Sequence, residues 1–479
     1  MTNVVSKEAI SSLDYLISAF RSPAYDARIS ETRYEYFYPV SGVKSTNSFR
    51  WTIPANAGNY VTNMESLILA LDLKITDKDQ KNIPSLDIQS APCNNFIFSA
   101  LRICYNTTCV LKMDHFPVYS YVRMLLNNDQ SDLLTWANTR CFYPDDEDAE
   151  LDSITCKGWK KRREMFGGEL KIPPKLEDNT TDNPDYATKN GKFAYSELPS
   201  FFIFKLDTPL VNNPLLPGVN ITVELDLNRP EFCFQSLDDS AAHTNINFAF
   251  ERARLYCKQT KLNDKLYLQL EEKLRKDAMR QFFTTTMINT HSISKGNKTA
   301  TIDSVGAGYY PSRLYLLFQD QSRFEGKFSL NSLKFPRKFN TKVAPFLLQK
   351  VRVTLKGQEI EGLSCDDANF SFRDEYFRLM NLTNQDVGRN AGTITFKSFK
   401  ENSCILVYDF TSTLNETEAP LLPLVKKGHI RIEVDFDRST TDPVTLISML
   451  ELQSVLTIEG NGKCTICLLY TSPSPRDRG

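Results

Sequence analysis

Apolar and polar side chains alternate one by one in several segments of this chain. At residues 67–75, five apolar side chains occupy every second position, and Asp72 and Lys74 stand between them. The same alternation occurs at residues 221–227, 351–355 and 430–436. Because neighbouring side chains of a strand point to opposite faces, this pattern predicts antiparallel sheets with one buried and one solvated face.

Three pairs of short segments resemble one another in the same order along the chain. The pairs are Leu101-Arg102-Ile103 with Val351-Arg352-Val353, residues 121–125 with 376–380, and residues 223–227 with 432–436. The offset between the copies is 352 − 102 = 250 for the first pair, 378 − 123 = 255 for the second and 435 − 226 = 209 for the third. This shared order indicates a tandem duplication. The smaller last offset predicts additional residues in the first copy, between Asn127 and Ser200.

The length of 479 residues is too great for one compact core and suits two domains of about 200 residues each. We therefore expect an all-β chain of two tandem β-sandwiches with a few short helices. The expected parts are an N-terminal arm with a short helix at 1–29, a first sandwich at 30–262 with a loop insertion near 128–200, a connecting helix at 263–282 and a second sandwich at 283–462. Alternation alone does not distinguish a jelly roll from other Greek-key sandwiches.

The C-terminal residues are set aside. From Cys467 onward the sequence resembles one reading frame of a sequencing-adapter DNA, so residues 467–479 are treated as an artefact. This removes one cysteine of Cys464-Thr465-Ile466-Cys467, and a single CxxC pair is weak evidence for a metal site. The eleven cysteines of the chain are expected to be reduced and buried, because no signal peptide opens the sequence.

A helix is predicted between the two sandwiches, because apolar residues recur there at helical spacing. These residues are Leu266, Leu270, Leu274, Ala278 and Phe282. We expect this stripe to cover a sheet edge or a core, and the alternative is a surface that binds a partner. A shorter amphipathic helix is expected at residues 11–20.

The insertion of the first copy is rich in charge. An acidic run from Asp145 to Glu150 is followed by the basic run Lys160-Lys161-Arg162-Arg163. We expect both runs to lie in a solvated surface loop and to balance each other's charge. For the acidic run the alternative is a calcium site, although the glycine and the spacing of an EF-hand are missing. For the basic run the alternatives are a nuclear-import signal and a contact with the genome.

No pattern of catalytic, cofactor-binding or metal-ligating residues occurs, so no residue is assigned to these roles. The four histidines are far apart in sequence and form no HxH or HExxH motif. They are His115, His243, His291 and His429. Gly306-Ala307-Gly308 is better explained as a turn before a strand than as a nucleotide-binding loop. The formal net charge of -1 argues against direct packing of nucleic acid, and no apolar run is long enough to predict a membrane span.

Several segments together carry a resemblance to a known family. They are Ser12-Leu13-Asp14-Tyr15-Leu16, Tyr34-Glu35-Tyr36-Phe37-Tyr38-Pro39-Val40, Asn94-Asn95-Phe96-Ile97-Phe98-Ser99-Ala100-Leu101, residues 121–127, Asn228-Arg229-Pro230-Glu231-Phe232 and residues 428–436. In these segments the chain resembles the capsid-like proteins of Polinton (Maverick) elements and adintovirus-like viruses. The resemblance implies a double jelly roll, with two eight-stranded rolls in one chain. It also implies a homotrimer whose six rolls form a pseudo-hexagonal capsomer of an icosahedral shell.

From this resemblance we expect a viral structural protein, the major capsid subunit, without enzymatic activity or cofactor. Its expected partners are further copies of itself, neighbouring capsomers and a minor capsid or penton protein, with no specific nucleic acid. Its expected location is the virion capsid. Two other classes stay open: a minor capsid or penton-type protein, and a β-sandwich that binds carbohydrate or acts as a cupin-like enzyme. The first usually has one roll, and the second needs a pocket with converging titratable groups.

Overall fold

The computed structural model describes residues 28–468 outside a set of gaps. The gaps are residues 41, 44–46, 56–59, 82, 84–89, 95–96, 129–134, 136–138, 147–149, 167–194, 196–197, 211–213, 216–217, 307, 341–342, 356–357, 365–370, 384–392 and 412–426. The helix expected at residues 11–20 lies outside the described residues.

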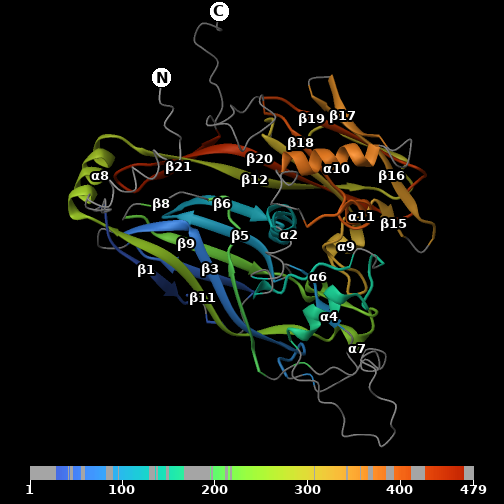
Figure 1. Cartoon of the computed structure of the whole chain (residues 1–479), viewed down its shortest axis with the longest axis horizontal. Helices are drawn as coiled ribbons and strands as arrows, with labels where there is room; N and C mark the ends of the chain where they lie inside the picture. Colours follow the sequence, from blue (N-terminus) through green and yellow to red (C-terminus); the bar gives the residue numbers. More distant parts are fainter. Residues whose placement is uncertain are drawn as a thin grey trace, which may run out of the picture.

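Two antiparallel sheets form the first half of the chain (Figure 1). Their strand orders are β1-β11-β3-β7 and β2-β9-β5-β6. The bounds are β1 Ile29–Phe37, β2 Ser48–Ile53, β3 Tyr60–Thr76, β5 Phe98–Tyr105, β6 Thr108–Asp114, β7 Ser200–Lys205, β9 Ile221–Leu227 and β11 Asn247–Leu262. Short strands accompany them, namely β4 Ser90–Pro92, which pairs with β10 Phe234–Ser236, and β8 Pro214–Leu215, which pairs with β3.

Two further sheets form the second half. Their strand orders are β12-β20-β14-β18 and β13-β19-β16, and β17 pairs with the free side of β16. The bounds are β12 Met279–Ile293, β13 Thr299–Ile302, β14 Arg313–Asp320, β16 Phe346–Leu355, β17 Gln358–Ser364, β18 Ile405–Asp409, β19 Ile430–Phe436 and β20 Val444–Ile458. The short strands β15 Lys338–Phe339 and β21 Cys464–Leu468 pair with β16 and β20.

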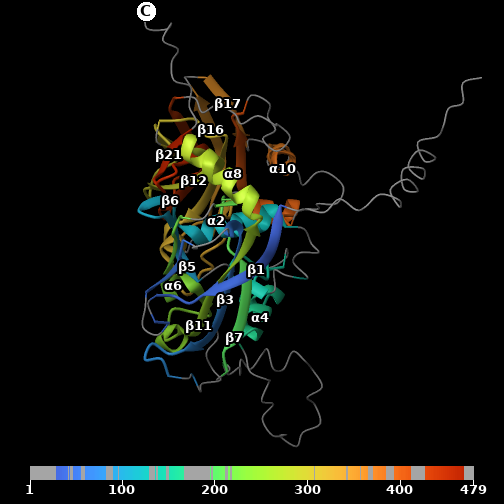
Figure 2. The same cartoon turned by 90° about the vertical axis from the view of Figure 1, so that its left-hand side faces the viewer.

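The two halves have the same strand topology. When the eight principal strands of each half are numbered along the chain, one sheet has the order 1-8-3-6 and the other 2-7-4-5 in both halves. This arrangement of two interlocked Greek keys is the jelly roll. We call β1 to β11 the first roll and β12 to β20 the second roll. Figure 2 shows the second roll above the first.

An ion pair is repeated between the two rolls at equivalent positions. In the first roll, Arg102 on β5 lies 2.8 Å from Asp226 and 3.6 Å from Glu224, both on β9. In the second roll, Arg352 on β16 lies 2.9 Å from Asp435 and 3.3 Å from Glu433 on β19. These residues belong to the segments whose resemblance predicted a duplication, so the repeat in the sequence is also a repeat in the structure.

The alternating segments place one face of each sheet in the core. On β3, the side chains of Leu67, Leu69, Leu71 and Leu73 are fully buried, while Lys74 is half-buried on the other face. Burial of such a leucine stabilises the folded chain by roughly 2 kcal/mol. The apolar cores of the two rolls are continuous with each other, since one cluster contains buried residues of both.

Each roll carries a helix between its fifth and sixth strands. These helices are α2 Phe116–Asn127 in the first roll and α10 Ser371–Leu382 in the second. Helix α2 lies between the two rolls, whereas α10 packs on β17 and β18, away from the first roll (Figure 1). The other helices among the described residues are α4 Lys157–Glu164, α6 Pro230–Cys233, α7 Ala241–Thr244, α8 Asp264–Lys276, α9 Gln321–Glu325 and α11 Phe396–Glu401.

The connecting helix is shorter than predicted. Helix α8 ends at Lys276, and Phe282 belongs to β12, where it pairs with Val455 of β20. Strand β12 pairs with β20 along its full length, and these hydrogen bonds outweigh the helical spacing of the last two residues of the predicted stripe.

The stripe of α8 does not enter a core, and its leucines are only partly covered. All residues of α8 are described, and none of them is buried. Leu266, Leu270 and Leu274 are half-buried, and Leu268 is 62% exposed. Of the C-terminal residues interpreted as an artefact, Cys467 and Leu468 belong to β21, where Cys467 pairs with Val455 of β20, and residues 469–479 lie outside the described residues.

Candidate functional site: the junction of the two rolls

Helix α2 is one of the elements of the first roll that contact the second roll, together with β6, which lies beside β12 and β21. His115 precedes the helix with a φ of 57°, and Pro117 follows in its first turn, where proline is tolerated because the first N–H groups have no helical acceptor. The ring centroid of Tyr121 lies 6.1 Å from that of Phe335 in the second roll. The hydroxyl of Thr393 donates to the carbonyl oxygen of Leu125 at 2.8 Å.

A buried ion pair joins α2 to the central strand of the neighbouring sheet. The Arg123 guanidinium lies 2.6 Å from the carboxylate of Glu451 on β20, whose side chain is 3% exposed. Burial alone would lower the pKa of Arg123, but the carboxylate of Glu451 outweighs this effect and raises that pKa. The Arg123 guanidinium therefore stays charged at every ordinary pH.

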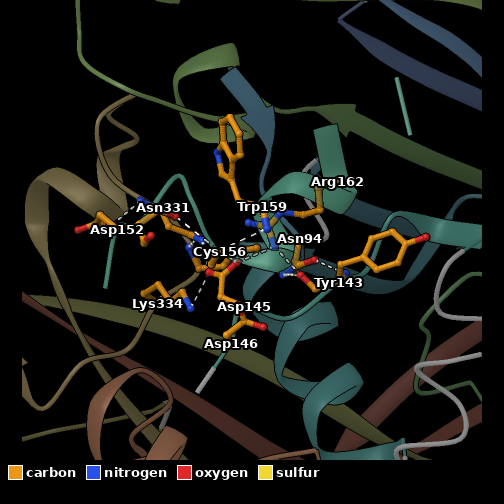
Figure 3. Close-up of polar contacts among 12 residues, drawn as sticks. Asn94, Tyr143, Asp145, Asp146, Asp152, Cys156, Trp159, Arg162, Asn331 and Lys334 are labelled. Carbon is orange, nitrogen blue, oxygen red and sulfur yellow. Dashed lines mark hydrogen bonds and ion pairs between the residues drawn. The ribbon is translucent and has the colours of Figure 1, made fainter. Parts of the chain in front are cut away.

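A second group of ion pairs surrounds Asp145, which is 5% exposed (Figure 3). One carboxylate oxygen lies 2.9 Å from Nη1 of Arg162 in α4, and the other lies 2.8 Å from Nζ of Lys334 in the second roll. The thiol of Cys156, which also caps α4, donates to the first oxygen at 3.2 Å. One carboxylate thus connects the loop before α4, the helix itself and the second roll.

The charges around Asp145 shift one another's proton affinity. Burial alone would raise the pKa of Asp145, but Arg162 and Lys334 outweigh it and hold that pKa well below its ordinary range. Burial alone would likewise lower the pKa of Lys334, which the carboxylate of Asp145 raises instead. All three groups are therefore charged, and removing one of them leaves a buried charge without compensation, at a cost of about 3 to 5 kcal/mol.

A third pair extends the junction toward α9. The carboxylate of Asp152 receives two hydrogen bonds from Arg323, at 2.5 and 2.9 Å, and a third from the backbone N–H of Asn331 at 2.9 Å. Arg323 also donates to the carbonyl oxygen of Asn331 at 2.8 Å and is 2% exposed. This bidentate geometry fixes the orientation of both groups as well as their separation.

Within the described part of the two charged runs, three side chains are buried and do not lie in a solvated loop as predicted, while residues 147–149 lie outside the described residues. Arg162 and Arg163 are buried, and Asp145 is occupied by two cations. Two of the four residues of the basic run are thus inaccessible, which weakens the alternative of an import signal or a genome contact. The calcium alternative gains no support, because no cluster of three or more potential metal ligands occurs among the described residues.

The four histidines lie in different places of the described structure. The ring of His115 packs 5.1 Å from that of Phe324, His243 lies in α7, His291 on β12, and His429 lies 3.4 Å from the hydroxyl of Ser304. Burial lowers the pKa of His115 and of His291. A cavity of about 840 Å³ in the first roll is lined by charged residues such as Lys74 and Glu251, with no histidine among its described lining residues.

The glycines at positions 306 and 308 lie in a turn, as the sequence predicts. Gly306 and Gly308 have φ of 104° and 81° and precede β14, as expected for a turn before a strand. Among the described residues, no helix combines the length and the apolar character needed to cross a membrane.

The residues that build this junction could not be predicted from the sequence. Arg123 lay in a recognised repeat but could not be matched with Glu451, because 328 positions separate them. Lys334, Arg323 and Asn331 stand in segments without any alternating or repeated pattern, and no signal in the sequence marks them.

The topology and the junction define a double jelly-roll protein. No family model matches the sequence, and no curated protein is similar to it in sequence. Comparison with solved structures finds a chain of the Sputnik virophage, 10% identical, covering 94% of this chain and 91% of that chain at a TM-score of 0.56. The mavirus major capsid protein is 11% identical, covering 100% and 98% at 0.51, and the PBCV-1 virus capsid is 8% identical, covering 95% and 100% at 0.51. At these identities the likeness is one of fold, along nearly the whole chain.

Proposed function

We propose that this chain is a major capsid subunit that associates as a homotrimer, so that six rolls form a pseudo-hexagonal capsomer of an icosahedral shell. The double jelly roll, shared along nearly the whole chain with viral major capsid proteins, supports the capsid role. The proposed partners are further copies of the chain, neighbouring capsomers and a penton-type protein, and the proposed location is the virion capsid.

The observation that carries the trimer is the asymmetry of the contact between the rolls. The first roll contributes helix α2, and the second contributes the face of its β20 sheet that carries Glu451. A contact between two different faces is heterologous. The second roll therefore keeps its own helix, and the first roll its own sheet face, for contacts with other chains. Three chains of two rolls supply six positions of one closed ring. A penton-type protein with one roll would have no such internal contact.

Mass measurement of the purified chain in solution tests this proposal. We expect a species of three chains, and electron microscopy of the same sample should show particles with a hexagonal outline. A stable monomer at micromolar concentration would reject the trimer.

A further inference from the structure

In the second roll, helix α2 covers the outer face of the sheet that contains β20 and β14. Strand β20 is buried on both of its faces along Val444–Ser454, and β14 is buried on both faces except at its last residue. Arg313 and Glu451 are direct partners and therefore share the face that α2 covers. The side chain of Tyr315, two residues along β14, points to the same face and is 1% exposed.

The equivalent face in the first roll carries exposed side chains. Tyr36 on β1 pairs with Tyr256 on β11, which pairs with Ile68 on β3, so these side chains share one face. Two residues further along β3, Ala70 pairs with Ile203 on β7, which belongs to the same face. The exposed fractions of its apolar members are 59% for Tyr34, 50% for Tyr36, 52% for Phe201 and 36% for Ile203.

This face is the outside of the β11 sheet, because the alternate residues of β3 fill the core. It spans four strands, a width of about 14 Å. The rings of Tyr36 and Tyr38 lie 5.6 Å apart, and those of Tyr36 and Tyr256 lie 5.7 Å apart. An aromatic patch of this kind is typical of a surface that another protein covers.

The counterpart of α2 in the second roll, helix α10, also has an exposed side. The repeated segments align Val122 of α2 with Phe377 of α10. Val122 is fully buried, whereas Phe377 is 63% exposed. On the side of α10 that faces its own roll, Leu379 is fully buried, and the guanidinium of Arg378 lies 5.7 Å from the ring centroid of Tyr408. The helix is thus anchored by one side and presents a phenylalanine on the other.

We propose that these two exposed faces bind each other between copies of the chain. Helix α10 of one copy packs, through Phe377, on the outer face of the β11 sheet in the first roll of the next copy. The contact pairs the same two elements of the roll that α2 and the β20 sheet pair within one chain, with Phe377 as its central side chain, since Tyr376 and Arg378 contact residues of their own roll. This inference rests on the proposed homotrimer and names the surfaces that hold it together.

The test uses the full chain with one substitution on each proposed face. Phe377→Glu and Ile203→Glu each place a charge in the contact, and each should raise the dissociation constant of the trimer by at least about 30-fold. Leu268→Glu on α8 is the matched control, because Leu268 is equally exposed at 62% and lies outside both faces. Mass measurement over a dilution series gives the fraction of trimer for each protein.

The outcomes separate the two proposals. If the unsubstituted chain and Leu268→Glu are trimers and both face variants are monomers with unchanged circular dichroism, the inference holds. If the unsubstituted chain is a trimer and the face variants remain trimers, the inference is overturned and the proposed function stands. A monomeric unsubstituted chain overturns the proposed function itself. Phe377→Ala, which only removes contact area, should weaken the trimer without adding a charge and so guards against a folding defect.

Discussion

The guanidinium of Arg123 lies 2.6 Å from the carboxylate of Glu451, and this contact joins the helix between strands β6 and β7 to the central strand of the other roll. The two residues come from different copies of the duplicated unit. The pair therefore makes the two rolls depend on each other for their stability.

Replacement of Arg123 by Met should destabilise the chain by about 3 kcal/mol, because the carboxylate of Glu451 stays buried without its partner. This value is the lower end of the range of about 3 to 5 kcal/mol that the loss of one partner of a buried ion pair costs, since the side chain of Arg123 is 23% exposed. Urea unfolding measures the change. Lys276→Met is the control, because it removes the exposed pair with Glu272 on α8. Equal stability of the two variants would contradict the role given to Arg123.

Replacement of Asp145 by Asn should change how stability depends on pH. Arg162 and Lys334 hold the pKa of Asp145 below its ordinary value of 3.8 when the chain is folded. The stability that this carboxylate contributes is therefore complete above that value and is lost as the pH falls below it. Unfolding in urea from about pH 6 to about pH 3 should show a steeper loss for the unsubstituted chain than for Asp145→Asn. Parallel curves would contradict the assignment.

The repeated ion pairs should respond alike to substitution. The side chains of Arg102 and Arg352 are 34% and 32% exposed, so each pair contributes only about 1 kcal/mol. Arg102→Met and Arg352→Met should therefore have equal small effects on unfolding, and the double variant should show their sum. A large difference between the two would indicate that the rolls no longer use this pair in the same way.

Buried thiols should resist alkylation in the folded chain. Burial raises the pKa of Cys93 to about 11 and that of Cys141 to about 12, whereas Cys109 is exposed on β6. Because the thiolate is the reactive form, iodoacetamide near pH 8 should modify Cys109 long before the two buried thiols. Peptide mass spectrometry locates the modified residues. Rapid modification of Cys93 without denaturant would contradict the burial of that thiol.

The sequence by itself determined the strands and their duplication. Alternation at residues 67–75 or 430–436 follows from local backbone geometry, which any strand with one buried face must obey. The repeated Arg102 and Arg352 segments carried enough identity to place equivalent strands in both halves. The two-domain division and the all-β class depend on such local patterns, and they could be predicted.

Only the tertiary structure decided which charges are buried, where the connecting helix ends and which faces stay exposed. Asp145 and Lys334 are 189 positions apart (334 − 145), and no local pattern indicates that they meet. Helical spacing continued to Phe282, but pairing with β20 made that residue part of a strand. Such choices depend on the free energy of contacts between distant segments, and that free energy is defined only once both rolls are folded against each other.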